Sequence, residues 1–397
     1  MFAKKFEKDL EYLKKNGLYR NPSGIQQKIE KYVIVNNQKL INFSSNDYLG
    51  LSDSSALKES ISKNFLKFGS SASSSRLVSA NYDIINIAEE KYASYFGYDE
   101  AIFFSSGYLA NLSIISTLFK KNDLIIFDKH IHASSIKGIL LSNCTFFGYK
   151  HNNMRHLQKR LEKITQKQNL TKKSNNDKYL ENEQIAVITE SLFSMDGDFL
   201  KIEEFKNLKK QYNFLSLIDE AHAFGAVGYE GKGIASEVAD IGIGTFSKAF
   251  GLFGSFVLLP KGFKEYLLNF ASGIIYTTCL PPAHAAIAID ILEIIKKSKD
   301  RQEKLKQNSK LLKKLLLSEG YTVHGDAHII SVEIGDELKA LKISNELIKK
   351  NFFVFSVRYP TVPLGKSILR LSMTALHSSD DIYQFIEQFN SIYSRLK

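Results

Sequence analysis

Lys248 is the residue of this chain whose surroundings most clearly favour chemistry. It lies in the segment TFSKAFG, among small, hydroxylated and apolar side chains, and it belongs to no charged run. A lysine shielded from water loses part of its preference for the ammonium form, so its amine can act as a nucleophile. The flanking Phe246, Ala249 and Phe250 favour such a shielded amine over an ordinary surface lysine. We therefore take Lys248 as a candidate nucleophile.

An acid and a histidine follow another apolar run of the sequence. Asp219 and Glu220 end the run LSLIDE, and His222 comes shortly after them. An aspartate at the end of a buried strand can also cap a helix or hold a loop, and a lone histidine is equally ambiguous. Asp219 and His222 lack a convincing set of additional ligands, so we expect no metal site.

A third candidate is the small-residue turn Ser105-Ser106-Gly107-Tyr108, between an apolar run and a helical pattern. The first turn of a helix presents free backbone N–H groups and the positive end of the helix dipole, which suit a phosphate group. Such a turn can equally be a simple connection between a strand and a helix. Which of these two roles the turn has depends on the residues that lie beside it.

Together, a phosphate cradle, an acid and a shielded amine are the groups that pyridoxal phosphate needs. Asp219 would keep the pyridine nitrogen protonated, the Lys248 amine would bond the aldehyde, and the turn at Gly107 would hold the phosphate. The sequence separation of Asp219 and Lys248 leaves room for about one strand and its loop, which permits the two side chains to meet but does not require it.

The elements that would position these residues alternate between short β-type runs and helical stretches. Strands separated by helices predict parallel pairing and an α/β core. The three candidates then fall at the carboxyl ends of strands, where open α/β sheets bind ligands. Strands are expected at 101–106, 124–128, 144–149, 185–191, 214–220 and 241–247, with helices at 107–119, after 128, from about 154 and at 201–212.

Changes of pattern along the chain predict three parts. We expect an N-terminal helix and extended arm over 1–44, a large α/β domain over 45–290 and a small C-terminal α+β domain over 291–397. In the last part the expected elements are helices from Arg301, at 337–350 and from Asp380, and strands at 328–335, 352–357 and 368–375.

Composition excludes several classes of protein. The 397 residues are 44% hydrophobic and 24% charged, which fits a folded globular protein and excludes disordered, collagenous and coiled-coil chains. Two cysteines cannot form a disulfide framework and suit a reducing compartment. The N-terminal stretch lacks the apolar region of a signal peptide, and polar residues and prolines interrupt the apolar stretch 274–295. We therefore expect a cytoplasmic protein without a membrane span.

The formal net charge of +11 gathers in the basic segments 150–184 and 296–320. Solvated helix faces explain such segments most simply. A docking surface for an acidic partner, such as an acyl-carrier protein or the phosphates of a coenzyme, is the alternative. No nucleic-acid-binding motif accompanies the charge, so we expect no nucleic-acid partner.

The motifs in their order resemble the α-oxoamine synthases, fold-type I pyridoxal phosphate enzymes that join an amino acid to an acyl thioester with loss of carbon dioxide. The similarity runs nearly end to end. It is carried by NFSSNDYLGLS (42–52), SRLVSANYD (75–83), FSSGYLAN (104–111), HAS (132–134), FSMDGD (193–198), DEAHAFG (219–225) and TFSKAFG (245–251). The resemblance implies a large, mostly parallel-sheet domain, a smaller α+β domain and a homodimer with its active site at the subunit interface.

The resemblance also implies roles for individual residues. Lys248 would form the Schiff base with the cofactor, Asp219 would face the pyridine nitrogen, and His222 would hydrogen-bond near the phenolic oxygen. His132 would stack on the ring and either assist proton transfer or polarise the acyl carbonyl. Further cofactor contacts would come from Gly107, Tyr108, Ser194 and Thr245, and substrate contacts from Thr361 and Arg370, with Arg370 holding a carboxylate.

Late segments point to a branch of the family. VRYPTVP (357–363) and ILRLSMTALH (368–377) resemble the members that condense L-alanine with a pimeloyl thioester, carried by acyl-carrier protein or coenzyme A, in biotin synthesis. The alternatives are glycine C-acetyltransferase, another family member, or a binding protein that keeps the fold without catalysis.

Three features depart from the family pattern. Arg20 matches an N-terminal substrate-contact arginine only approximately. The segment GSSASSSR (69–76) is rich in serine where many relatives carry glycine, which could stiffen a loop near the acyl site. The polar stretch 171–182 resembles a surface insertion.

Overall fold

The computed structural model describes residues 2–173 and 184–396. They form two compact units. The large unit comprises residues 55–194 and 199–299, and the small unit comprises residues 1–54, 195–198 and 300–397. The predicted domain boundaries near residues 44 and 290 stay a prediction.

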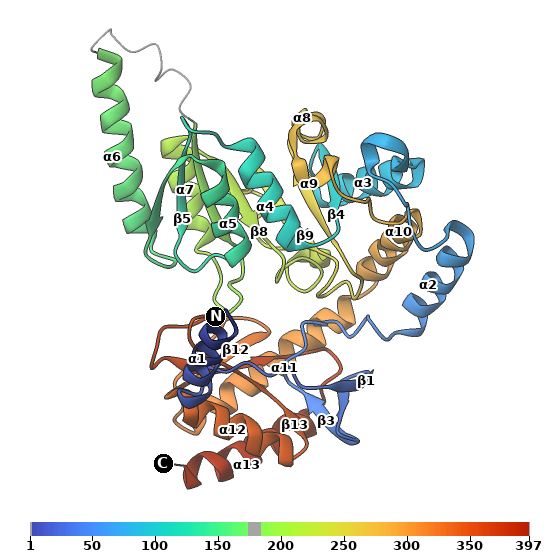
Figure 1. Cartoon of the computed structure of the whole chain (residues 1–397), viewed down its shortest axis with the longest axis vertical. Helices are drawn as coiled ribbons and strands as arrows, with labels where there is room; N and C mark the ends of the chain where they lie inside the picture. Colours follow the sequence, from blue (N-terminus) through green and yellow to red (C-terminus); the bar gives the residue numbers. More distant parts are fainter. Residues whose placement is uncertain (1, 174–183, 397) are drawn as a thin grey trace. The chain divides into compact units, whose positions relative to one another are not determined.

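The large unit is built on a seven-stranded sheet (Figure 1). The pairs β5–β6, β5–β7, β7–β8 and β8–β9 are parallel, as predicted, and β10 runs antiparallel to its neighbours β4 and β9. In spatial order the strands are β4 (Glu100–Phe104), β10 (Ser255–Leu259), β9 (Ile241–Thr245), β8 (Leu215–Asp219), β7 (Ile185–Glu190), β5 (Leu124–Asp128) and β6 (Thr145–Tyr149).

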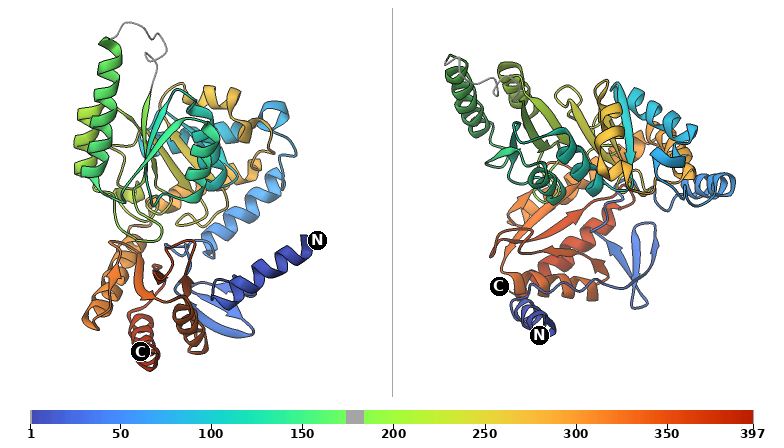
Figure 2. Two further views of the ribbon diagram at one scale, coloured as in Figure 1. Left: turned by 60° about the vertical axis from the view of Figure 1, so that its left-hand side comes forward. Right: turned by 45° about the horizontal axis from the view of Figure 1, so that its top comes forward.

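Helices cover both faces of this sheet. Alternate residues of the central strands pack into different clusters, with Leu217 on one side and Ile218 on the other. The left view of Figure 2 shows helices α4 and α5 on one side of the strands and α6 on the other. The helices of the unit are α2 (Ser55–Phe68), α3 (Asp83–Phe96), α4 (Gly107–Leu118), α5 (Ala133–Ser142), α6 (Met154–Lys173), α7 (Ile202–Tyr212), α8 (Phe263–Phe270), α9 (Ser272–Ile275) and α10 (Pro282–Lys296), with the short turns η1 (Arg76–Ala80) and η2 (Tyr229–Gly231).

The small unit contains two four-stranded sheets and four helices among the described residues. One sheet has the order β1-β2-β3-β13 and the other the order β11-β12-β15-β14. Their strands are β1 (Ile25–Ile29), β2 (Tyr32–Val35), β3 (Gln38–Asn42), β13 (Phe352–Phe353), β11 (Val323–His324), β12 (Ile329–Gly335), β15 (Ser367–Ser372) and β14 (Phe355–Val357). The helices are α1 (Phe2–Lys15), α11 (Lys299–Ser318), α12 (Glu337–Lys349) and α13 (Ser379–Arg395).

Three local predictions need correction. Strand β10 was not predicted, and it makes the sheet mixed. The predicted single strand 352–357 is two strands, because β13 pairs with β3 and β14 pairs with β15 in a different sheet. The extended arm after α1 forms the antiparallel strands β1, β2 and β3. Of the predicted insertion 171–182, residues 171–173 end helix α6, and the remainder lies outside the described residues.

No helix within residues 2–173 and 184–396 combines the length and the apolar character that crossing a bilayer requires. The two basic segments largely coincide with helices α6 and α11. Their charge is therefore carried mainly by helical side chains.

Acid sensitivity is expected from His377, a buried residue of the small unit. Its ring stacks on Phe43 with centroids 4.4 Å apart, and its Nδ1 accepts a hydrogen bond from the Thr374 N–H at 3.1 Å. Burial lowers the pKa of His377 to about 4, from 6.5. The unfolded chain takes up this proton below about pH 6.5, whereas the folded ring resists it until near pH 4. The free energy of unfolding should therefore fall as the pH falls through this window, by up to about 3 kcal/mol.

The measurement is urea unfolding at about pH 7.5 and about pH 5 for the wild type and His377→Asn, since an asparagine oxygen can replace Nδ1 as acceptor. The variant should lose less stability on acidification than the wild type. His324→Asn, at a half-exposed histidine of the same unit, is the matched control. An unchanged acid sensitivity in His377→Asn would show that this ring does not control it.

Candidate active site

Asp219 ends strand β8 at the carboxyl edge of the large sheet, and its side chain is held from two directions. Its Oδ2 accepts a hydrogen bond from Asn111 Nδ2 at 2.8 Å, and its Oδ1 accepts one from the Ala221 N–H at 2.9 Å. Ser135 Oγ in turn donates to Asn111 Oδ1 at 3.0 Å. Asp219, Asn111 and Ser135 are all buried. Their series of hydrogen bonds therefore fixes the orientation of the Asp219 carboxylate.

Lys248 follows the neighbouring strand β9 at the same edge of the sheet. Its Nζ lies 2.8 Å from His222 Nε2, and the flanking Phe246 and Phe250 are buried. The loop that carries Lys248 is closed by a hydrogen bond, because Thr245 Oγ1 donates to the Gly254 carbonyl at 3.0 Å. The structure thus brings the predicted lysine and histidine into direct contact, with the amine partly shielded from water as predicted.

The start of helix α4 provides the expected N-terminus. Ser106 is the N-cap, and its side chain accepts a hydrogen bond from the Leu109 N–H at 3.2 Å. Gly107 opens the helix close to Thr245, since a Cβ built on Gly107 would lie 3.9 Å from the Thr245 Cβ. The N–H groups of this first turn therefore lie beside the loop that leads to Lys248.

His132 caps helix α5 after strand β5. Its Nδ1 lies 2.6 Å from Ser134 Oγ, and its ring meets that of Tyr108 edge to face, with centroids 6.3 Å apart. Loss of hydration lowers the pKa of His132, the charge of Asp219 opposes this shift, and that of Lys248 supports it. His132 therefore lies within electrostatic reach of both predicted cofactor residues.

A second carboxyl lies beside Asp219. Glu190 ends strand β7 and is the register partner of Asp219 in the parallel pair β7–β8. Burial raises the pKa of Glu190 well above its usual range, and Asp219 adds to the shift while Lys248 reduces it. The backbone N–H of Ser194, a predicted cofactor contact, lies within hydrogen-bonding reach of Glu190 and favours its charged form.

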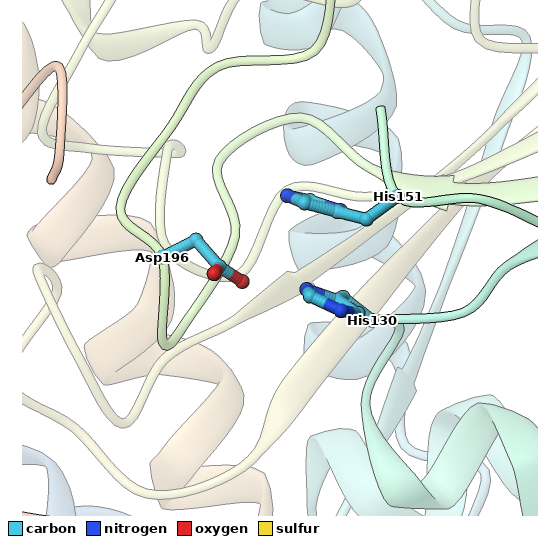
Figure 3. Close-up of side chains that lie close together, drawn as sticks. All are labelled: His130, His151 and Asp196. Atoms are coloured by element: carbon cyan, nitrogen blue, oxygen red, sulfur yellow. The ribbon is translucent and has the colours of Figure 1, made fainter. Parts of the chain in front are cut away.

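Two further histidines lie near the carboxyl ends of β5 and β6. The rings of His130 and His151 stack with centroids 4.0 Å apart and planes 9° from parallel (Figure 3). His151 Nδ1 lies 3.1 Å from the buried Asp128 Oδ1, and its ring meets Phe193 edge to face. Sequence analysis did not single out this pair.

The predicted substrate residues belong to the small unit. Arg370 lies on β15 and is buried, with its guanidinium donating to Ser372 Oγ at 2.6 Å and to Asn46 Oδ1 at 3.3 and 3.4 Å. Arg20 and Thr361 are exposed.

Both exposed residues lie near Arg358. The Thr361 N–H donates to the Arg358 carbonyl at 3.0 Å. Loss of hydration, followed by the charge of Arg20, lowers the pKa of Arg358. The small unit thus presents a rigid arginine on a strand and a separate basic group around Arg358.

The large unit fits pyridoxal phosphate on structural grounds. It places a fixed carboxylate, a shielded amine with a histidine partner and a helix N-terminus at neighbouring strand ends, the arrangement that open α/β sheets use for phosphorylated ligands. The turn at Gly107 is uncrowded, because a Cβ built there would meet, among the described residues beyond its chain neighbours and its own helix backbone, the Thr245 Cβ at 3.9 Å.

Sequence reasoning missed Asn111, Ser135, Glu190 and Arg358 as members of these groups. Glu190 carried the same signal as Asp219, a carboxylate at the end of an apolar strand. Asn111 lies one helical turn after Gly107, a spacing that places both on one face of α4.

Comparison with known proteins agrees with this geometry. The chain matches the family "Aminotransferase class I and II" over residues 38–389. It is 34% identical over 399 residues to the 8-amino-7-oxononanoate synthase of Lysinibacillus sphaericus, covering 99% of this chain and 97% of the relative. The "Putative 8-amino-7-oxononanoate synthase" of Bacillus cereus (strain ATCC 10987 / NRS 248) is 32% identical over 380 residues, 94% of this chain and 92% of the relative.

Solved structures are similar over the same length. The Sphingomonas wittichii serine palmitoyltransferase has a TM-score of 0.88 and 27% identity, covering 100% of this chain and 98% of its own. The 8-amino-7-oxononanoate synthase of Francisella tularensis has a TM-score of 0.75 and 30% identity, covering 90% and 98%. A lysine-to-alanine variant of a serine palmitoyltransferase from S. paucimobilis, with a TM-score of 0.88 and 25% identity over 98% and 97% of the two chains, was solved with a bound aldimine of pyridoxal phosphate and myriocin. The chain therefore belongs to the aminotransferase class I and II family and, within it, to the α-oxoamine synthases, which are pyridoxal phosphate-dependent acyltransferases.

Proposed function

We propose that this enzyme condenses L-alanine with a pimeloyl thioester, with loss of carbon dioxide, and is thus an 8-amino-7-oxononanoate synthase of biotin synthesis. The observation that carries the proposal is the 34% identity over 99% of the chain to the synthase of Lysinibacillus sphaericus. The late segments 357–363 and 368–377 resemble this branch of the family and support it.

A second candidate activity is the transfer of a longer acyl chain to L-serine. The backbone similarity to the serine palmitoyltransferase of Sphingomonas wittichii, with a TM-score of 0.88, favours it. Both candidates require the same cofactor residues, so they differ only in the two substrates. Glycine C-acetyltransferase is a further family alternative, with glycine and acetyl-CoA as its substrates.

We assign the cofactor-binding roles to residues of the large unit. Lys248 would hold the aldehyde carbon covalently, and Asp219, fixed by Asn111 and Ala221, would accept the hydrogen bond of the protonated pyridine nitrogen. The helix N-terminus at Gly107 would bind the phosphate, together with Thr245. His132 would stack on the ring, and Tyr108 and Ser194 would complete the contacts. When bound, the cofactor withdraws electrons from the amino acid Cα.

The same residues would handle protons. The Lys248 Nζ, once free, would accept the Cα proton of the amino acid, because a shielded amine is a competent base. His222 Nε2, 2.8 Å from this Nζ, would orient the amine between turnovers and lie near the phenolic oxygen of the cofactor. His132, with its pKa lowered, would remain neutral near pH 7 and could donate or accept a proton at the acyl carbonyl.

Substrate binding is assigned to the small unit. Arg370 is buried and held by Asn46 and Ser372, so its guanidinium is ordered for a two-pronged contact with a carboxylate. Arg20 and Thr361 would contact the acyl substrate, and Arg358, which accepts a hydrogen bond from the Thr361 N–H and feels the charge of Arg20, would lie beside it. We further propose that the enzyme works as a homodimer and receives the acyl group from an acyl-carrier protein or from coenzyme A.

The test is a matrix of amino acids against acyl thioesters, scored by the release of free thiol and by product mass. L-alanine, L-serine and glycine are each paired with pimeloyl, palmitoyl and acetyl thioesters, with coenzyme A and acyl-carrier protein as alternative carriers. The proposal predicts the highest kcat/KM for L-alanine with a pimeloyl thioester. A higher value for L-serine with palmitoyl-CoA would establish the second candidate instead.

Asn111 should matter because its side chain joins Asp219 to Ser135. In Asn111→Ala, Asp219 loses a buried N–H donor, which typically costs about 1–3 kcal/mol. We expect kcat/KM to fall by at least about tenfold and the cofactor to dissociate faster. Ser116→Ala, which removes a hydroxyl bonded within the same helix, is the control. Equal kinetics in both variants would show that Asn111 does not position Asp219.

A further inference from the structure

Glu190 is a buried carboxyl that none of the assigned roles uses. Its side chain is only 3% exposed, and its Oε1 has no hydrogen-bond partner among the described residues. The backbone N–H groups of His132 and Ser194 lie within hydrogen-bonding reach of its carboxyl and favour the charged form. His132 caps α5 after strand β5, and Ser194 follows β7. One side chain therefore lies beside both of the loops that carry these residues.

The position of Glu190 relative to Asp219 restricts its charge. The two are register partners in the parallel pair β7–β8, so their side chains leave the sheet on the same face. Two adjacent buried carboxylates repel each other, and burial penalises each charge further. Both oxygens of Asp219 accept an N–H hydrogen bond, whereas Glu190 leaves one oxygen unpaired.

The surrounding charges also favour the uncharged form of Glu190. Burial raises the pKa of Glu190 well above its usual range, Asp219 raises it further, and Lys248 acts in the opposite direction. The two backbone N–H groups also favour the anion, but their effect is smaller than that of burial. When one oxygen of the Glu190 carboxyl carries a proton, the other oxygen can still accept hydrogen bonds from the backbone N–H groups.

We propose that Glu190 is a positioning residue that acts as a neutral carboxylic acid: it ties the His132 loop to the Ser194 loop and leaves Asp219 as the single anion of the pair. The proposal rests on the proposed cofactor roles of His132, Ser194 and Asp219. It adds to them a residue that holds two of these contacts in place without meeting the reacting atoms.

Three variants test it. Glu190→Gln keeps a carbonyl acceptor and carries no charge, whereas Glu190→Ala leaves both backbone N–H groups without their acceptor. Glu220→Gln is the matched control, because Glu220 is also buried and follows Asp219 directly but accepts its hydrogen bonds from the Ile234 and Ala235 N–H groups. Glu220 comes directly after β8, and its two carboxyl oxygens are taken up by the 234–235 backbone instead of the His132 and Ser194 loops.

The first measurement is the pH titration of the absorption band of the lysine-bound cofactor. A neutral Glu190 predicts that the Glu190→Gln midpoint stays within about 0.3 pH units of the wild type, because one uncharged group replaces another. An anionic Glu190 would stabilise nearby protonated groups, so its removal would lower the midpoint by about one unit or more. Such a drop, absent from Glu220→Gln, would overturn the proposal.

The second measurement is the affinity of the apoprotein for pyridoxal phosphate, with visible circular dichroism of the bound cofactor. We expect Glu190→Ala to weaken binding by about tenfold or more and to change the dichroic band, and Glu190→Gln to stay within about threefold of the wild type. Wild-type affinity and dichroism in Glu190→Ala would refute the tie between the loops.

If Glu190→Ala does not fold, the pH titration of Glu190→Gln decides alone. A wild-type protein without the lysine-bound band would contradict the proposed function itself, which separates the two failures.

Discussion

Lys248→Ala is expected to reduce turnover by about 10⁴-fold or more and to remove the absorption band of the lysine-bound cofactor. The variant loses the amine that holds the aldehyde and that we assign as the acceptor of the Cα proton, and a positioned base alone contributes about 10²–10⁴-fold. The measurement combines steady-state kinetics, with thiol release as the signal, and an absorption spectrum of the purified variant.

Lys137→Ala provides the control for this experiment. Lys137 is an exposed lysine on helix α5 of the same unit, so the control makes the same substitution outside the site. It should keep the wild-type spectrum and rate. Full turnover in Lys248→Ala, with folding confirmed by circular dichroism, would exclude Lys248 from the chemistry.

Asp219→Asn is expected to give the second largest loss, about 10²–10³-fold in kcat, with the fold retained. Asparagine has a similar size, but it cannot supply the negative charge that keeps the pyridine nitrogen protonated, and the loss of one preorganised electrostatic contact typically has this magnitude. The amide also places an N–H₂ group where Asn111 Nδ2 or the Ala221 N–H donates. Cofactor binding should therefore weaken as well.

Two measurements check this result. Steady-state kinetics give the change in kcat, and thermal unfolding of the apoprotein shows whether the fold is intact. Asp240→Asn is the matched control, since Asp240 lies in the same unit but pairs with Lys209. Normal kcat in Asp219→Asn would contradict the role assigned to Asp219, whatever the stability of the variant.

The parallel part of the large sheet could be predicted because its central strands β7, β8 and β9 are buried on both faces and read as short apolar runs between other elements. Strand β10 escaped prediction because it follows β9 after a loop, without a helix between them, and such a strand breaks the alternation on which the prediction relied. The split of 352–357 into β13 and β14 depends on pairing with β3 and β15, which the local sequence does not encode.

In the candidate site, too, some residues could be identified from the local sequence and others depend on tertiary contacts. Lys248, Asp219 and His222 could be proposed from the sequence as candidates because each ends or follows an apolar strand and carries a reactive group. Glu190 and Asn111 were missed because their importance depends on strand register and helix packing. The register of β7 on β8 sets Glu190 beside Asp219, and the packing of α4 brings Asn111 within 2.8 Å of the same carboxylate.

The central claim is that Lys248 holds the aldehyde of pyridoxal phosphate. The most direct measurement is borohydride reduction of the holoenzyme, followed by proteolysis and peptide mass spectrometry. We predict that the phosphopyridoxyl group is found on the peptide that contains Lys248 and that the modification is absent from Lys248→Ala. Its stoichiometric recovery on a different lysine, or its persistence in Lys248→Ala, would contradict the account.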